Sequence, residues 1–241
     1  MSVKPIVEVR DLVKTFTRGA ESIEVLKELT LDVPQGEFLA LMGPSGSGKT
    51  TLLNLIAGLD QPTEGDIIVD GQLISEMSES QLARWRTRHV GFVFQFYYLL
   101  SVLSAYENVE LPLLLLPMTR KQRDEQVKRA LSLVGLEDRM RHRPGQLSGG
   151  QQQRVGIARA MVTDPTLIVA DEPTGDLDSK SAEEILTILN ILREELKKTI
   201  IMVTHDPKAA DRAQRILHLE KGRLIHDTGR QDVNALAQST T

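Results

Sequence analysis

The sequence predicts an α/β protein with an N-terminal antiparallel β layer, a core in which strands alternate with helices, and a helical segment inserted into that core. Alternating apolar residues over 6–16 and 25–34 are typical of half-buried strands. Nearly continuous apolar runs at 166–171 and 199–204 are typical of parallel strands buried on both faces. A further short strand at 38–43 leads into a glycine-rich loop, where the alternating core begins.

The other elements of the first two thirds follow in chain order. Residues 50–59 show a helix-type apolar pattern, and residues 65–71 return to a strand. The segment from about Ser80 to Met161 is mostly helical by pattern. We therefore expect one domain spanning residues 1–241, with a helical subdomain over about 96–160.

The last third predicts a strand, a helix and a second strand. The helix over 181–196 lies between the two buried apolar runs, which implies a right-handed crossover between parallel strands. Residues 216–227 predict a hairpin that turns at Lys221 and Gly222. Apolar stripes support two of the helices, namely Val127, Leu131 and Val134 in one and Ile185, Ile188, Leu189, Leu192 and Leu196 in the other.

Composition excludes several classes of function. The 241 residues are 41% hydrophobic and 26% charged, which is typical of a globular chain with one sizeable core. The net charge of −4 argues against general nucleic-acid binding. Basic clusters at 120–123 and 138–144 are interleaved with acids, so we expect no nucleic-acid partner. The absence of cysteine excludes disulfides, thiolate catalysis and Cys-ligated zinc.

The sequence also limits contact with a membrane. The most apolar stretch, 111–118, is far shorter than the roughly 20 residues that a spanning helix needs. No secretory signal pattern is present at the N-terminus. We therefore expect any membrane contact to run through a partner protein.

The stretch GPSGSGKT matches the phosphate-binding loop pattern and lies directly between a buried strand and a helix. Glycines allow backbone N–H groups to face phosphates, a lysine supplies positive charge, and a threonine hydroxyl can ligate Mg²⁺. A flexible glycine turn is the alternative, which the flanking strand and helix disfavour. The candidate nucleotide-binding residues are Gly43, Pro44, Ser45, Gly46, Ser47, Gly48, Lys49, Thr50 and Thr51.

Two adjacent carboxylates follow the buried run TLIVAD, at the strand end where open α/β sheets bind ligands. Asp171 is a candidate Mg²⁺ ligand, mostly through water, and Glu172 is a candidate to polarise the water that attacks the γ-phosphate. Alone, the pair is better interpreted as the end of a strand in a polar turn before Pro173. The phosphate-binding loop makes the catalytic interpretation the better one.

The run LSGGQQQR at 147–154 precedes a helix-type pattern and holds no nucleophile, metal ligand or carboxylate. Ser148, Gly149 and Gly150 offer backbone N–H groups at the start of that helix, where an anion is favoured. By itself this stretch is better interpreted as an ordinary serine-capped helix that follows a turn.

Three motifs occur along the chain in the order GPSGSGKT, LSGGQQQR and TLIVADEP. With these motifs the chain resembles the ATPase subunit of an ABC transporter over nearly its whole length. The resemblance implies a P-loop NTPase core of the RecA-like type, hydrolysis of ATP, and Mg²⁺ as cofactor. It also implies a second copy of the chain as partner in an ATP-dependent, head-to-tail dimer. In that dimer Ser148, Gly149 and Gly150 reach the γ-phosphate bound by Lys49 of the other copy.

The resemblance assigns roles to four further residues. Gln95 corresponds to the glutamine that touches Mg²⁺ and the attacking water, and His205 to the histidine that contacts the γ-phosphate. Asp178 matches the loop that crosses between subunits, although it is equally a helix N-cap. Phe16 occupies the position of the aromatic that stacks on adenine, with core packing as the competing role.

The segment FQFYYLLSVLSAYENVELPLLLL resembles ATPases that pair with integral membrane permeases bearing large periplasmic domains. That group works in lipoprotein release, macrolide export and cell division. The resemblance implies a peripheral location on the cytoplasmic face of the bacterial inner membrane. The aromatic and leucine residues of the segment either form a groove for a cytoplasmic helix of the permease or belong to a buried helical core.

Other functions remain as alternatives. A cell-division-type regulatory ATPase fits the same motifs, and so does an ABC ATPase without a transport role, although the single phosphate-binding loop and the absence of sustained heptads disfavour the latter. A nucleotide kinase leaves the LSGGQQQR run and His205 unexplained. An inactive ATP sensor is disfavoured by Lys49, Glu172 and His205 together.

Overall fold

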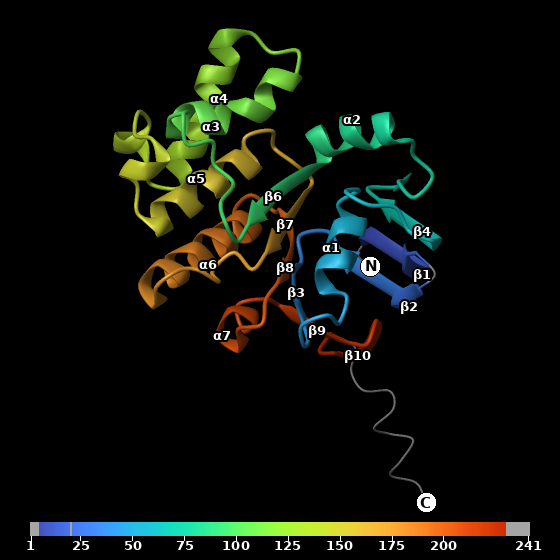
Figure 1. Ribbon diagram of the computed structural model, residues 1–241. Helices are drawn as coiled ribbons and strands as arrows, with labels where there is room; N and C mark the ends of the chain where they lie inside the picture. Colours follow the sequence, from blue (N-terminus) through green and yellow to red (C-terminus); the bar gives the residue numbers. More distant parts are fainter. Residues whose placement is uncertain (1–4, 20, 230–241) are drawn as a thin grey trace, which may run out of the picture.

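The computed structural model describes residues 5–19 and 21–229, and these form two β-sheets with helices packed against them (Figure 1). The parts of the predicted 1–241 domain at residues 1–4, 20 and 230–241 lie outside the described residues. The first sheet is antiparallel, with the strand order β2-β1-β4-β5. Its strands are β1 (Pro5–Arg18), β2 (Glu21–Pro34), β4 (Glu64–Val69) and β5 (Gln72–Leu73).

The second sheet is mostly parallel, with the strand order β10-β9-β3-β8-β7-β6, and only β10 is antiparallel to its neighbour. The strands that pair in parallel are far apart in sequence, because helices lie between them along the chain, as parallel pairing requires. Its strands are β3 (Phe38–Met42), β6 (Val90–Phe94), β7 (Leu167–Asp171), β8 (Thr199–Val203), β9 (Arg215–Glu220) and β10 (Arg223–Asp227).

Helices follow the glycine loop, cross over between parallel strands, and fill the segment between β6 and β7. In Figure 1 the helices α3 and α4 form the upper lobe, α5 and α6 lie against one side of the parallel sheet, and α1 lies beside the antiparallel sheet. The helices are α1 (Lys49–Ile56), α2 (Glu79–His89), α3 (Ala105–Glu110), α4 (Arg120–Leu133), α5 (Gly149–Met161), α6 (Ser179–Glu194) and α7 (Pro207–Ala210), with 3₁₀ turns η1 (Leu111–Leu115), η2 (Glu137–Arg139) and η3 (Pro144–Gln146).

The parallel strands are buried on both faces, which explains their continuous apolar sequence. In β8, Ile200 and Met202 belong to a core shared with the helices between β6 and β7, whereas Ile201 and Val203 belong to a second core shared with the antiparallel sheet and α1. Each fully buried aliphatic side chain contributes about 1.5–3 kcal/mol. The sheet therefore holds the two layers together and fixes the edge where its strands end.

One helix ends earlier than its apolar stripe. Ile185, Leu189 and Leu192 of α6 are fully buried as predicted, but Leu196 lies beyond the end of the helix and is 44% exposed. The chain must turn there to enter β8, and the turn places Lys197 at a positive φ of 55°. Backbone geometry thus overrides the periodicity at this end.

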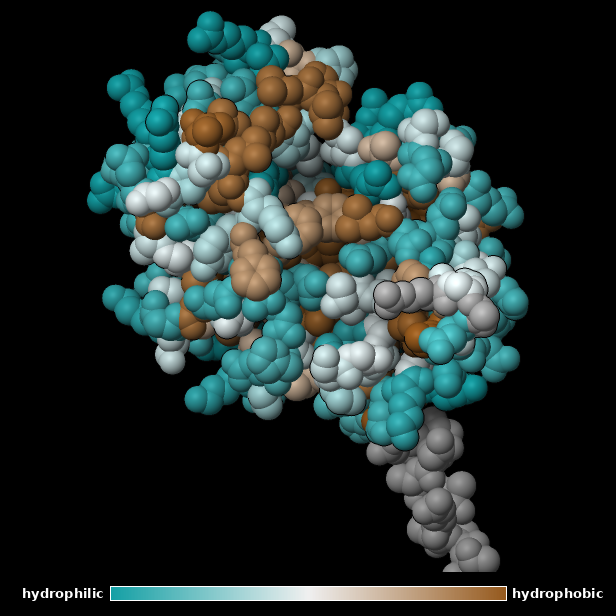
Figure 2. All heavy atoms as spheres, viewed as in Figure 1, coloured by the Kyte–Doolittle hydropathy of each residue, from teal (hydrophilic) through white to brown (hydrophobic). Residues whose placement is uncertain are grey.

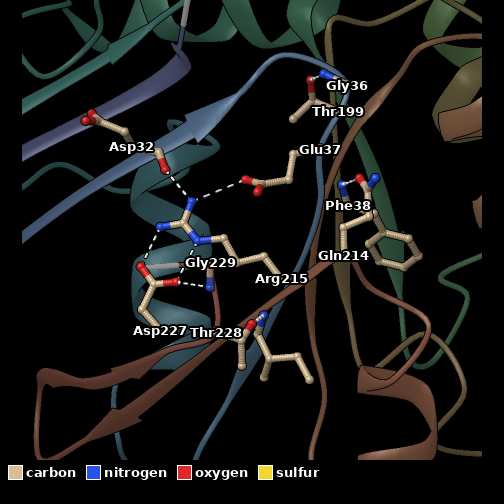
Figure 3. Close-up of polar contacts among 11 residues, drawn as sticks. Asp32, Gly36, Glu37, Phe38, Thr199, Gln214, Arg215, Asp227, Thr228 and Gly229 are labelled. Atoms are coloured by element: carbon tan, nitrogen blue, oxygen red, sulfur yellow. Dashed lines mark hydrogen bonds and ion pairs between the residues drawn. The ribbon is translucent and has the colours of Figure 1, made fainter. Parts of the chain in front are cut away.

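The hairpin of β9 and β10 is fixed at its open end by Arg215 (Figure 3). The guanidinium donates to both carboxylate oxygens of Asp227 at 2.8 and 2.7 Å, to the Asp32 carbonyl at 2.8 Å, and to Glu37 at 3.4 Å. Figure 3 shows these groups converging on one cation from β2, the turn before β3, and β10. Arg215 therefore joins the hairpin to both sheets.

The other end of the hairpin contacts the glycine loop. Lys221 and Gly222 form the predicted turn, with φ values of 49° and 81°. The N–H of Gly222 donates to the Ser47 carbonyl at 3.2 Å, and the Gly222 carbonyl accepts from Lys27 N at 3.0 Å. A Cβ on Gly222 would lie 2.4 Å from the Val25 carbonyl oxygen, so glycine is required.

Candidate nucleotide-binding and catalytic site

The glycine loop joins β3 to α1 in a conformation that needs its glycines. Gly43, Gly46 and Gly48 have φ values of 144°, 76° and 102°. A Cβ on Gly43 would lie 2.1 Å from the Leu219 carbonyl of the hairpin. The ammonium of Lys49, only 8% exposed, donates to the carbonyls of Gly43 and Pro44 at 2.9 Å each. The loop therefore curls at a helix N-terminus, a geometry suited to an anion.

The ends of β7 and β8 bring the candidate catalytic residues to this loop. Asp171 pairs with Val203 in register, and the Thr50 hydroxyl donates to Asp171 at 3.3 Å. Burial raises the pKa of Asp171, the Thr50 hydrogen bond lowers it, and the charge of Glu172 raises it further. A divalent cation at this carboxylate would offset the cost of burying its charge.

Glu172 and His205 contact one another beside the loop. The Glu172 N–H donates to the Val203 carbonyl at 2.9 Å, and the residue has a positive φ of 50°. His205 Nδ1 lies 2.5 Å from Glu172 Oε2. A glutamate in the left-handed region is strained, which is common where a side chain is aimed at a reacting group.

A cavity of about 480 Å³ joins these parts into one site. Val25 and Val203 line it alongside predicted residues, which are Gly43, Ser45, Gly46, Gly48, Lys49, Thr50, Thr51, Glu172 and His205. Pro44 and Ser47 belong to the same loop, and Asp171 is joined to it through Thr50.

The residues of this cavity fit a nucleoside triphosphate with Mg²⁺. Within the described residues, the buried hydroxyl of Ser47 has no hydrogen-bond partner and is a free donor in the loop. The loop supplies N–H groups and one ammonium for phosphate oxygens. The Thr50 hydroxyl and the Asp171 carboxylate are the hard oxygen ligands that Mg²⁺ prefers.

Three predicted positions lie outside the lining of this cavity. Phe16 is 46% exposed on β1, and Lys14 Nζ lies over its ring at 4.8 Å from the centroid. Gln95 directly follows β6, and its side-chain amide donates to Asp176 at 3.5 Å. Asp178 caps α6 by accepting from the N–H groups of Lys180 and Ser181 at 3.0 Å, and these hydrogen bonds lower its pKa.

The Ser148–Gly150 turn also lies on another part of the chain, at the start of α5. The Ser148 hydroxyl accepts from Gln151 N at 3.3 Å, and Gln151 Oε1 accepts from Ser148 N at 3.0 Å. This is a capping box, as the serine-capped interpretation predicts. Ser148 itself is exposed, and a Cβ on Gly150 would lie 2.8 Å from the Ser181 hydroxyl at the start of α6. The turn therefore presents its first residues to solvent rather than to this chain's own loop.

Sequence reasoning did not identify two residues of α5 that join this helix to the Gln95 region. Gln153, fully buried, donates to the carbonyls of Phe94 and Pro173 at 3.0 and 2.6 Å. Arg159 donates to the carbonyls of Tyr97 and Tyr98 at 2.7 and 2.6 Å. The spacing of Gln153 and Arg159 within the helix pattern is the only sequence signal for these contacts. It does not identify the acceptors, because those carbonyl groups are distant in sequence.

A second hollow region lies between α2 and the upper lobe. Figure 2 shows apolar surface on that lobe, next to a hollow beside α2. Two cavities there, of about 650 and 520 Å³, share Leu115 in their lining, together with Ala83 and Thr87 of α2. Leu115 comes from the predicted permease-binding segment, which also has Phe96, Tyr98, Leu100, Val102 and Leu114 exposed.

A glycine loop between a buried strand and a helix, with adjacent carboxylates at the end of another parallel strand of the same sheet, defines a P-loop nucleoside triphosphatase. The family model described as "ABC transporter" matches residues 26–175. The chain belongs to the ABC transporter family, and it is the ATP-binding, ATP-hydrolysing subunit of such a transporter.

Curated relatives agree with this family. The chain is 47% identical to the lipoprotein-releasing system ATP-binding protein LolD of Chromohalobacter salexigens, over 90% of this chain and 91% of that protein. It is 46% identical to an uncharacterised ABC transporter ATP-binding protein of Thermotoga maritima, over 92% and 94%. It is 45% identical to the macrolide export ATP-binding/permease protein MacB of Marinobacter nauticus, of which it spans only 37%.

Solved structures confirm the fold class. The chain superposes with a TM-score of 0.84 on the ATP-binding cassette MJ0796, solved as a dimer in a post-hydrolysis state bound to ADP and Pi. That protein is 43% identical, over 92% of this chain and 97% of the other. Among the described residues, no helix combines the length and apolar character needed to cross a membrane.

Proposed function

We propose that two copies of this chain bind two ATP molecules between them, head to tail. The Ser148–Gly150 turn of one copy then contacts the γ-phosphate held by Lys49 of the other. The observation that carries this proposal is the position of that turn at the start of α5, where Ser148 is exposed and none of the three residues lines its own chain's phosphate cavity. A helix N-terminus with free N–H groups stabilises an anion, and a partner's triphosphate provides one.

Within each site, the loop residues from Gly43 to Thr51 hold the phosphates. Thr50, Asp171 and Gln95 are the proposed Mg²⁺ ligands, Asp171 mostly through water. When bound, Mg²⁺ supplies charge neutralisation at the β- and γ-phosphate oxygens. Phe16 is the proposed adenine-stacking residue, and Asp178 lies in the loop that faces the partner copy.

Glu172 is the proposed general base and His205 the proposed γ-phosphate contact. The 2.5 Å contact between them orients the Glu172 carboxylate, which then accepts a proton from the attacking water. His205 is exposed on the cavity side, so its second ring nitrogen is available to a phosphate oxygen. Hydrolysis and phosphate release remove the anion that both copies share, and the dimer opens.

Replacing Glu172 with Gln tests this proposal. The amide cannot accept the proton, so turnover should fall by about 10²-fold or more while ATP still binds. The variant should therefore be a dimer with ATP and a monomer without it, measured by sedimentation velocity. Lys49→Ala is the matched control, because it should abolish ATP binding and with it the dimer. Unchanged turnover in Glu172→Gln, or a monomer at high concentration with saturating ATP, contradicts the proposal.

We further propose that the dimer drives an integral membrane permease with a large periplasmic domain, in lipoprotein release or in export of lipophilic or macrolide-type substrates. The similarity to LolD and MacB supports this, as does the apolar region that includes Leu115. In this arrangement the chain lies at the cytoplasmic face of the bacterial inner membrane and contacts it only through the permease. Co-purification with a four-helix permease is the expected result, whereas association with a six-helix importer permease contradicts this branch.

A further inference from the structure

The segment that follows β6, residues 95–103, is held against α5 by side chains from that helix. Gln153 bonds to the Phe94 carbonyl, just before the segment, and to the Pro173 carbonyl, just after Glu172. Arg159, further along α5, donates from both terminal nitrogens to the carbonyls of Tyr97 and Tyr98. The segment that begins with Gln95 is thus hydrogen-bonded to α5, which starts at the Ser148–Gly150 turn, at two positions along that helix.

This segment has a strained backbone. Tyr97 and Tyr98 both have positive φ, at 53° and 46°, a region that large side chains rarely adopt. Such a conformation persists only where surrounding contacts hold it. The two hydrogen bonds from Arg159 are such contacts, and burial lowers the pKa of that guanidinium, so its charge depends on these carbonyls for compensation.

The strained conformation turns the Tyr97 ring toward the Ser148–Gly150 turn. A Cβ built on Gly149 would lie 3.0 Å from the Tyr97 hydroxyl oxygen and 4.0 Å from its ring carbon Cζ. Two residues earlier in the segment, the Gln95 side-chain amide lies similarly close to Gly175. A Cβ built on Gly175 would be 2.9 Å from the Gln95 amide nitrogen. One short segment therefore contacts both the turn at α5 and the loop that follows Glu172.

We propose that Tyr97, held by Arg159, is a positioning residue for the Ser148–Gly150 turn. It sets where Gly149 presents its backbone N–H to the partner copy's nucleotide, and it passes a displacement of Gln95 on to that turn. The inference rests on the proposed ATP-bound dimer. It predicts that Tyr97 controls association of the two copies without affecting how each copy binds ATP.

The test uses the Glu172→Gln chain, in which ATP stabilises the dimer, and adds Tyr97→Leu. Two quantities are measured, namely the dimer dissociation constant with saturating ATP and the affinity of dilute monomer for a fluorescent ATP analogue. Misplacing the Gly149 N–H should raise the dimer dissociation constant by about tenfold or more. Affinity of the monomer for the analogue should stay unchanged, because Tyr97 lies outside the phosphate cavity.

Tyr98→Leu is the matched control. It removes the same kind of ring from the same positive-φ backbone, but Tyr98 is 62% exposed and its ring contacts Phe94 rather than Gly149. Its dimer should match the parent. Arg159→Met should weaken the dimer as Tyr97→Leu does, and Arg159→Lys, which keeps a cationic donor, should restore part of the loss.

Separate outcomes overturn the inference and the proposed function. A Glu172→Gln parent that does not dimerise with ATP removes the proposed function and the inference with it. A parent that dimerises while Tyr97→Leu dimerises equally well overturns the inference alone. A Tyr97→Leu chain that loses monomer affinity and thermal stability in parallel shows a general structural role, which also overturns it.

Discussion

At the scale of single residues, the environment of the Phe16 side chain is suited to stacking on an adenine ring. The Lys14 ammonium covers one face of the Phe16 ring. Lys14 is itself fixed by Asp60 Oδ1 at 2.8 Å and by the Gln61 carbonyl at 2.7 Å. Because 46% of Phe16 is exposed, its ring remains accessible to a base. This exposure disfavours the competing role in core packing.

Phe16→Ala should therefore weaken nucleotide binding. Stacking of a base on an aromatic ring contributes about 1–3 kcal/mol, so the ATP dissociation constant should rise by about tenfold or more. The rate at saturating ATP should not change, and Phe16→Tyr should keep the parent affinity. Ile23, the cross-strand partner of Phe16 and 60% exposed, supplies the control. An equal loss in Ile23→Ala would indicate damage to the strand pair instead of a lost stacking contact.

At the scale of elements, the β9–β10 hairpin supports the phosphate-binding loop, and Arg215 anchors the hairpin. The side chains of Arg215 and Glu37 are only 10% and 14% exposed. Removing one partner of a nearly buried ion pair costs about 3–5 kcal/mol, because the other charge stays buried. Arg215→Met should lower the free energy of unfolding by about that amount at neutral pH, measured by urea denaturation. Arg212→Met removes a more exposed pair with Glu183 and should cost far less.

The pH dependence of that loss has a definite sign. Burial raises the pKa of Glu37 above its ordinary value of 4.5, and the charge of Arg215 partly offsets the rise. A carboxyl group whose pKa is raised by folding contributes stability below its ordinary pKa and loses that contribution as pH rises through the folded pKa. Without Arg215 the Glu37 pKa rises further. The deficit of Arg215→Met should therefore be smallest near pH 4.5 and grow toward pH 7, and a deficit independent of pH would contradict this account.

The elements show which parts of the fold the sequence can predict. Strands β7 and β8 are predictable because both of their faces are buried, so all of their residues are apolar except Asp171 at the end of β7 and Thr199 at the start of β8. The end of α6 is not, because the left-handed turn at Lys197 removes Leu196 from its stripe. The pattern from Ser80 to Met161 likewise includes strand β6, whose five residues are too few to separate from flanking helices by periodicity.

The candidate site likewise contains residues that the sequence can predict and residues that it cannot. Lys49, Thr50 and Glu172 are predictable because their chemistry requires a fixed order of residue types beside a strand. Arg159 and Tyr97 are not, because the hydrogen bond between them joins residues 62 positions apart in the chain. Backbone strain at Tyr97 also leaves no trace in composition, since tyrosine is an ordinary residue of strands and loops.

At the scale of the whole molecule, the apolar region between α2 and the upper lobe is suited to a helix of the permease. Leu115 lines both hollows beside α2, and the 96–115 segment to which it belongs has further leucine and aromatic side chains exposed. Large apolar side chains exposed together around a groove are typical of a surface that binds an amphipathic helix. The same segment follows Gln95 directly, so in the proposed complex the permease and the nucleotide would act on one stretch of chain.

Leu115→Glu tests this surface. Leu115 is 74% exposed and lines both hollows, so a carboxylate there should prevent a permease helix from burying its apolar face. The isolated chain should keep its ATPase rate and thermal stability, whereas co-purification with the permease and stimulation of ATPase activity by it should be lost. Ile225→Glu places the same charge on β10, at a residue that is 60% exposed and lies outside both hollows, and should retain both properties. If Leu115→Glu binds the permease as the parent does, the permease contacts another face, and transport force does not enter through the segment after Gln95.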